Sequence, residues 1–389
     1  MHFHRFHLLA HLFSVLLFLL SSSINTVAAA WGLSYLVIGL INLTGAAAYV
    51  VSSLYLGHWG DRLGYKRVLA GALTLFAAFL WGGFFWSEPA HLFLFAVGVN
   101  GFFGVFFPTV EGLLSSQEKR EGVDPVATTV RFTLSWSSGN ALGMALGPYL
   151  IQRLPPVVFG FGIALCLAAA AGVFRHRKRH GDSLPGPYPV RLRRAPAPVD
   201  LPRIGLYRRA YRLTFLLSGI VYSAVMALFP KLMALYAVPL DRAGFIVVGV
   251  NLGVFATFAV LGSFRRWVGA PRLCFWLLLV FPLGAASFWL PPSVPAFFGM
   301  ALLVGVTYAV PYTFALFYGL NSPDEDHGRQ GSYHEAIVGV IFGLGPLLGG
   351  LFLDLWPDPR SLGAMAAGLW LASLANQVNF LRKLAPQAA

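Results

Sequence analysis

The chain has 389 residues, of which 57% are hydrophobic and only 11% are charged. A soluble protein of this size needs about 25% charged residues to cover its surface. This composition therefore excludes an ordinary soluble globular protein and indicates a protein embedded in lipid. The net charge is +13, but the Lys and Arg residues lie between apolar runs, which argues against a nucleic-acid partner and is typical of membrane loops.

Long apolar runs follow one another along the chain. A membrane-spanning helix needs about 20 mainly apolar residues. Applied along the chain, this length predicts an all-α membrane protein with twelve transmembrane helices. The first run resembles a secretory signal, but it continues to Ala30 and is long enough to span, so we expect it to stay as the first helix. The predicted spans are 8–30, 34–56, 68–86, 91–114, 127–151, 156–174, 210–236, 243–263, 273–290, 295–320, 332–354 and 361–381.

The composition changes sharply between the sixth and seventh runs. Residues 175–209 contain ten Lys or Arg and six Pro, and such a segment cannot bury enough apolar surface to fold. We predict a basic, Pro-rich cytoplasmic linker at 175–209, between an N-terminal six-helix bundle (1–174) and a C-terminal six-helix bundle (210–389).

The basic residues also predict the orientation in the membrane. With the linker in the cytoplasm, both termini and all but four of the 28 Lys and Arg residues fall on the cytoplasmic side. We therefore expect a multi-pass protein of the bacterial cytoplasmic (inner) membrane, present as a monomer in the lipid bilayer. The cysteines, Cys166 and Cys274, lie within apolar runs and show no metal-ligand spacing, so no metal or other cofactor is predicted.

Two patterns repeat between the halves. The spacing of Gly57, Gly64 and Arg67 recurs 205 residues later. The matching residues are Gly262, Gly269 and Arg272, in the run GSFRRWVGAPR. The run from Arg131 to Gly147-Pro148 recurs 198 residues later, from Arg329 to Gly345-Pro346. The shared order and similar offsets predict a duplicated six-helix unit, hence two pseudo-symmetric bundles with a substrate site at their interface.

These motifs carry a resemblance to a known family. GHWGDRLGYKR at 57–67 resembles the loop signature of the major facilitator superfamily, and GNALGMALGP on the fifth span resembles the glycine-proline signature of its drug antiporters. The resemblance implies that the loop acts as a conformational latch against the eleventh helix. The residues that fill the loop signature are Gly57, Asp61, Arg62, Gly64, Lys66 and Arg67.

A second group of residues is expected to act through backbone packing. Small residues four apart let helices approach closely, and a proline within a span kinks or hinges it. The packing and hinge residues predicted on the fifth and eleventh spans are Gly143, Gly147, Pro148, Gly339, Gly343, Gly345 and Pro346.

Ionisable residues within the spans are few. Glu111, Arg131, His334 and Glu335 all fall near the cytoplasmic ends of their helices, where they predict either a structural charge network at an inner gate or a coupling site. Helices one and seven lack the carboxylates familiar in the family, so Glu335 beside His334 is the best candidate for proton coupling.

The resemblance also implies a cavity lined mainly by helices one, four, seven and ten. The polar and aromatic residues on these helices and on helix five predict an apolar, aromatic lining with neutral hydrogen-bonding groups, which suits an uncharged ligand. The candidates are Asn25, Thr26, Asn100, Trp136, Asn140, Tyr222, Ser223, Tyr308, Tyr312 and Thr313.

These observations predict a secondary transporter that works by alternating access and exports a small, mostly apolar or neutral solute. Uptake or exchange of a sugar-like neutral nutrient is an alternative, and so is a membrane scaffold or sensor on the same fold. An enzyme is not predicted, because the sequence contains neither HExxH nor GxSxG.

Overall fold

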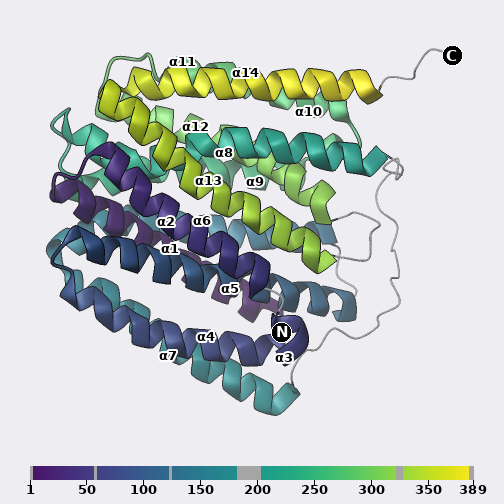
Figure 1. The fold of residues 1–389 in the computed structure, drawn as a ribbon. Helices are drawn as coiled ribbons and strands as arrows, with labels where there is room; N and C mark the ends of the chain where they lie inside the picture. The colour runs from purple at the N-terminus through teal and green to yellow at the C-terminus, as the bar shows by residue number, and fades with distance from the viewer. Residues whose placement is uncertain (1–2, 57–58, 122–124, 182–202, 321–326, 385–389) are drawn as a thin grey trace.

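The structure is a computed structural model that describes residues 3–56, 59–121, 125–181, 203–320 and 327–384. All regular elements in these ranges are helices, and most of the long ones run in roughly the same direction in Figure 1. The elements of the first half are α1 (Phe3–Ala30), α2 (Tyr35–Tyr55), α3 (Trp59–Leu63), α4 (Tyr65–Leu80), η1 (Trp81–Phe85), α5 (Pro89–Glu121), α6 (Pro125–Arg153) and α7 (Pro155–His180).

The second half repeats this order of long helices above the first half in Figure 1. Its elements are α8 (Ile204–Ala234), α9 (Leu240–Ser263), η3 (Arg265–Trp267), α10 (Pro271–Leu277), α11 (Val280–Ser287), α12 (Val294–Leu320), α13 (His327–Leu355) and α14 (Pro359–Leu384).

The predicted transmembrane helices are present. Within the described residues, nine helices are long and apolar enough to cross a membrane. Helices α6 and α14, with 29 and 26 residues, also have the length, although their Ser, Thr, Asn and Gln residues make them more polar. The ninth predicted span, 273–290, is divided into α10 and α11, which are separated by Leu278 and Leu279.

Helices enter the range predicted as linker from both sides. Helix α7 continues through RHRKRH to His180, and α8 begins at Ile204 instead of 210. The reason is local, because neither RHRKRH nor the six residues from Ile204 contain a proline, and Arg and Lys are good helix formers. Residues 182–202, which contain all six prolines of the predicted linker, lie outside the described residues.

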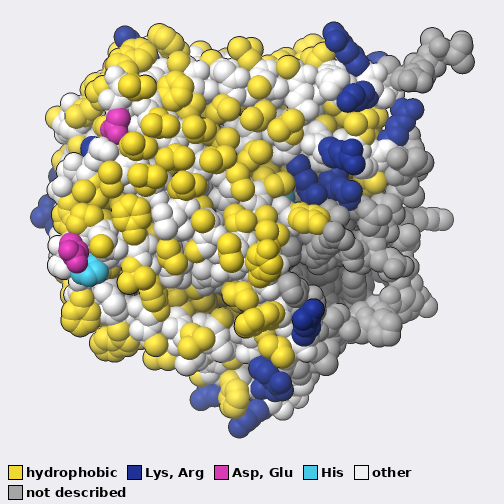
Figure 2. Space-filling view, viewed as in Figure 1, with side chains coloured by type: hydrophobic (Ala, Val, Ile, Leu, Met, Phe, Trp, Pro, Cys, Tyr) yellow, Lys and Arg dark blue, Asp and Glu magenta, His cyan; other side chains and the backbone are white. Residues whose placement is uncertain are grey.

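The outer surface is apolar around the middle of the molecule. Figure 2 shows hydrophobic side chains over most of the visible face, while most of its Lys and Arg lie toward the right, where α7 ends and α8 begins in Figure 1. We call this the linker end of the molecule. Side chains such as Leu75, Phe85 and Leu371 are more than 65% exposed, as expected where lipid is the solvent.

The repeat seen in the sequence has structural counterparts. Gly64 and Gly269 both adopt positive φ angles, 92° and 71°, just before α4 and α10. A Cβ added to Gly147 would lie 1.9 Å from Oγ of Ser22, and one added to Gly345 would lie 1.9 Å from Oγ of Ser223. Each half therefore packs the corresponding helices together, α6 on α1 and α13 on α8.

The halves meet along two matching helix pairs, α2 with α13 and α9 with α6. A Cβ on Gly39 of α2 would lie 2.5 Å from the carbonyl oxygen of Pro346. A Cβ on Gly244 of α9 would lie 2.5 Å from the Met144 carbonyl oxygen and 3.0 Å from Cδ of Pro148. Both proline-containing helices are thus approached by a glycine of the opposite half.

The glycine pairs of α6 and α13 are not equivalent, although they share the same spacing. Gly143 lies against the backbone of α1, within its own half, whereas Gly339 and Gly343 lie against α2 of the other half. The symmetry mate of Gly147 is Gly345, because both face a serine of the first helix in their half. Spacing alone does not determine which neighbour a helix face meets.

Candidate functional site

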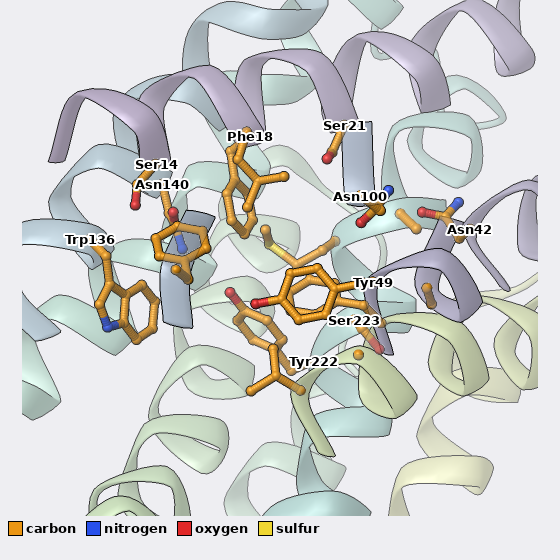
Figure 3. Close-up of a pocket in the computed structure, with 18 of the residues that line it drawn as sticks. Ser14, Phe18, Ser21, Asn42, Tyr49, Asn100, Trp136, Asn140, Tyr222 and Ser223 are labelled. Carbon is orange, nitrogen blue, oxygen red and sulfur yellow. The ribbon is translucent and has the colours of Figure 1, made fainter. Parts of the chain in front are cut away.

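A central cavity of about 110 Å³ lies between the two halves. Its walls come from α1, α2, α5 and α6 of the first half and from α8, α12 and α13 of the second. Figure 3 shows amide, hydroxyl and aromatic side chains turned toward this space. Because both halves supply its walls, a molecule bound there would contact both.

Most of the residues that the sequence predicts for the cavity wall do line this space. Thr26 and Thr313 do not line it, and their hydroxyl groups donate to carbonyl oxygens one turn earlier in their own helices, at 2.7 and 2.8 Å. The predicted residues that line the cavity are Asn25, Asn100, Trp136, Asn140, Tyr222, Ser223, Tyr308 and Tyr312.

Several of these polar side chains are held in place by the protein itself. The Asn42 amide donates to Oδ1 of Asn25, at 2.8 Å, and so joins α1 to α2. The Asn100 amide donates to the Ala96 carbonyl at 2.9 Å. On the opposite wall, the rings of Tyr222 and Tyr308 stack with centroids 3.9 Å apart. The result is a pre-formed lining of neutral hydrogen-bonding groups and flat aromatic faces.

Two carboxyl groups meet at one edge of the cavity. Glu335 of α13 is only 6% exposed, and it accepts a hydrogen bond from the Tyr49 hydroxyl of α2. The Glu111 side chain, on α5, also lines the cavity, and its carboxyl group lies beside that of Glu335. Two carboxylates buried side by side would repel each other, so this arrangement favours a proton on one of them.

The other two ionisable candidates do not join this cluster. His334 points into aromatic surroundings, stacked on Phe215 at 5.2 Å and edge-on to Tyr312 at 5.0 Å, and no hydrogen bond joins it to Glu335. The Arg131 side chain is exposed, and no ion pair joins it to Glu111 or Glu335. The structure therefore brings together only the two acids of the predicted set, with Tyr49 as an additional member.

Comparison with known proteins decides the family. The sequence profile described as Major Facilitator Superfamily matches residues 6–321. The chain belongs to the major facilitator superfamily. It is accordingly a multi-pass integral membrane protein and a secondary transporter, not an enzyme.

Solved structures of the superfamily share its fold. The crystal structure of the nucleoside transporter NupG is 15% identical, with a TM-score of 0.68, and the match covers 100% of both chains. A bacterial homologue of the human lysosomal transporter Spinster, inward-facing and unoccupied, is 16% identical, with a TM-score of 0.62, covering 98% of this chain and 95% of that one. No curated protein matches the chain in sequence.

The signature loop of this superfamily member is only partly described. Gly57 lies outside the described residues, and the Asp61 side chain is not described, although its backbone belongs to α3. Arg62 and Arg67 are exposed. Lys66 is buried, and its Nζ donates to the Gly181 carbonyl at the end of α7, at 2.8 Å. Lys66 thus ties the loop to the sixth span, which the sequence did not indicate.

Polar contacts join the halves of the transporter at the end opposite the linker end. The Asp354 carboxylate of α13 accepts hydrogen bonds from the backbone N–H groups of Tyr35 and Leu36, both at 2.9 Å, at the start of α2. Nearby, Nζ of Lys231 donates to the Leu33 carbonyl. Arg153 pairs with Asp241 at 2.7 Å, joining α6 to α9. Opening the cavity toward this end requires these contacts to break.

Some cavity residues were missed by reasoning from the sequence. Tyr49 and Asn42 lie on α2, and Ser14 and Ser21 lie on α1. The expectation that helices one, four, seven and ten form the walls left α2 out. A signal existed, because Asn42 and Tyr49 are polar residues in the middle of a mainly apolar span, where such residues are usually functional.

Proposed function

We propose that this transporter moves a small uncharged solute by alternating access, and that it works as an exporter. The observation that carries the proposal is the cavity lining, in which both halves contribute neutral hydrogen-bonding groups among aromatic and aliphatic side chains. Its two acidic groups lie side by side, and a pair that shares a proton carries less negative charge to attract a cationic solute. The glycine-proline motif on α6, which resembles that of drug antiporters, supports export.

The proton is the coupling ion in this proposal. In it, the neighbouring carboxyl groups of Glu111 and Glu335 share a proton when the halves are together, and Tyr49 adds a hydrogen bond to Glu335 from a third helix. Loss of that proton leaves two negative charges in contact on α5 and α13, and their repulsion favours separation of the halves. A proton gradient can in this way drive the exchange between conformations.

The orientation and assembly belong to the same proposal. The gathering of Lys and Arg at the linker end supports a cytoplasmic location for that end, and so for both termini, in a bacterial inner membrane. We propose a monomer, because the two halves that line the cavity belong to the same chain.

Uptake or exchange of a neutral polar nutrient is the second candidate. It is favoured by the number of amide and hydroxyl groups on the wall, including Asn42 and Ser21, which exceeds what a purely lipophilic solute would use. The fold shared with the nucleoside transporter NupG is compatible with a nutrient that carries a flat ring and hydroxyl groups.

The test is transport by the purified protein in liposomes with an imposed pH gradient. Solutes are chosen by thermal-shift screening of lipophilic compounds, nucleosides and sugars. Gradient-driven export of a neutral compound supports the first candidate, and selective stabilisation by sugars or nucleosides with proton-driven uptake supports the second. Absence of any solute movement would leave a scaffold or sensor and contradict both.

A further inference from the structure

The cavity amides differ in how well their hydrogen-bonding groups are satisfied. Asn25 and Asn42 bond to each other, and Asn100 bonds to a backbone carbonyl. Asn140 of α6 is different, because it is only 4% exposed and its Oδ1 has no hydrogen-bond partner among the described residues. Buried polar atoms are rarely left unpaired in native proteins.

Ser14 of α1 shows the same contrast within its own helix. Ser22, Ser23 and Thr26 each donate to the carbonyl oxygen four residues earlier, at 2.6 to 2.7 Å. The Ser14 side chain is fully buried and lines the cavity, yet its Oγ makes no such bond and finds no other partner in the described part of the chain.

Asn140 and Ser14 lie next to each other. A Cβ added to Gly139, the residue before Asn140, would lie 2.8 Å from Cβ of Ser14, so α1 and α6 are in close contact here. Figure 3 shows both side chains on one wall of the cavity, with the indole of Trp136 beside them. Trp136 lies four residues before Asn140, which places both on one face of α6.

An asparagine amide offers one donor and one acceptor side by side. Its complement is another amide-type edge, in which an N–H group lies next to a C=O group. This holds for either orientation of the Asn140 amide. The Ser14 hydroxyl can donate or accept, and the Trp136 ring offers a flat apolar surface on which a planar ring can stack.

We propose that Asn140 and Ser14, with Trp136 beside them, form a subsite for the amide-type edge of a neutral planar ring in the transported solute. A nucleobase carries such an edge. The proposal rests on the proposed function, since it names the chemistry by which the same cavity selects its solute.

The first experiment tests whether the two groups are free for a ligand, and it needs no solute. Asn140→Leu and Ser14→Ala are compared with Asn42→Leu and Ser22→Ala in the full-length protein. The control variants remove groups that are already bonded, so they should lower the Tm. The two subsite variants should leave the Tm unchanged or raise it, because they remove buried groups that lack partners. Equal losses of Tm in both sets would overturn the proposal.

The second experiment measures recognition with a matched pair of probes. These are uridine and the derivative in which a methyl group replaces its ring N–H, with binding followed by tryptophan fluorescence. Wild-type protein should bind uridine about tenfold or more tightly than the methylated compound, as expected for one satisfied buried group. Asn140→Leu should remove this preference, Ser14→Ala should reduce it, and Ser22→Ala should keep it.

The outcomes distinguish a failure of the proposed subsite from a failure of the proposed transport function. Binding of neither probe, or equal binding of both by wild-type protein, overturns the subsite even where liposomes transport another neutral solute. Conversely, a preference for uridine that depends on Asn140 upholds the subsite even where no gradient-driven movement is found, and it is then the proposed transport function that fails.

Discussion

Tyr49 and Glu335 join the two halves of the protein by a buried hydrogen bond, with the Tyr49 hydroxyl as donor and Oε2 of Glu335 as acceptor. The bond lies on the α2–α13 interface, where Gly339 lies close to the Tyr49 ring, and Glu111 adds a carboxyl group from α5. A proton-binding group is therefore part of the contact that holds the halves together. Protonation and the packing of the halves cannot vary independently here.

Replacing Glu335 by Gln should abolish transport driven by a pH gradient. Glutamine keeps the size of the side chain and an oxygen that can accept from Tyr49, but it cannot release a proton. Solute exchange without a gradient should continue, because the packing of α2 on α13 is retained. The measurement compares gradient-driven transport with exchange in liposomes that contain equal amounts of protein.

Tyr49→Phe is the matched control for that experiment. It removes the hydrogen bond and leaves both acids able to titrate, so gradient dependence should persist at an altered rate. Unchanged gradient-driven transport by Glu335→Gln would remove Glu335 from the coupling role.

Gly39→Val should block function by keeping the halves from packing. The added side chain would meet backbone atoms of Pro346 and Leu347, which cannot move aside as a flexible side chain can. Overpacking of this kind costs about 1–3 kcal/mol, so transport should fall by about fivefold or more. Gly71→Val is the control, since no atom lies within 4 Å of a Cβ at Gly71. Equal transport by both variants would show that the glycine contact is unimportant.

Much of the fold could be predicted from the sequence, because the helices are set by local properties. Apolar length places each span, and Gly64 and Gly269 mark matching turns that require positive φ. The members of the cavity were predicted where a polar residue interrupts an apolar helix, as at Asn100. Contacts between helices were not predictable, so neither the pairing of Glu111 with Glu335 nor the exposed position of Arg131 could be read from spacing.

Asp354→Asn should favour conformations that are open at the end opposite the linker end. The carboxylate accepts from two N–H groups at the start of α2, and loss of its charge there costs about 0.3–1 kcal/mol, up to about 2. Labelling of Ser21→Cys in the cavity by a membrane-impermeant thiol reagent, added outside cells, should become about two- to tenfold faster. The native Cys166 and Cys274 are buried, so background labelling is low.

Asp358→Asn provides the comparison for this test. Its oxygens bond to Arg360 and Tyr236, which belong to the same half, so the contact between the halves is untouched. Labelling at the wild-type rate is expected for this variant. Equal acceleration by both would mean that general loosening of this end, and not the Asp354 contact, controls access.

Asp61→Asn should impair transport without affecting membrane insertion or Tm. The corresponding loop of the second half has Trp267 near that place, where the indole is buried, donates to the Leu261 carbonyl at 3.0 Å and packs against Phe314. That loop is held by contacts within its own half. A carboxylate in the first-half loop has no use in positive-inside topology, and the superfamily resemblance assigns it to a contact that forms and breaks during transport. Trp267→Phe is the converse variant and should lower Tm, because the indole hydrogen bond is lost. Wild-type transport by Asp61→Asn would contradict the latch role that the superfamily resemblance implies.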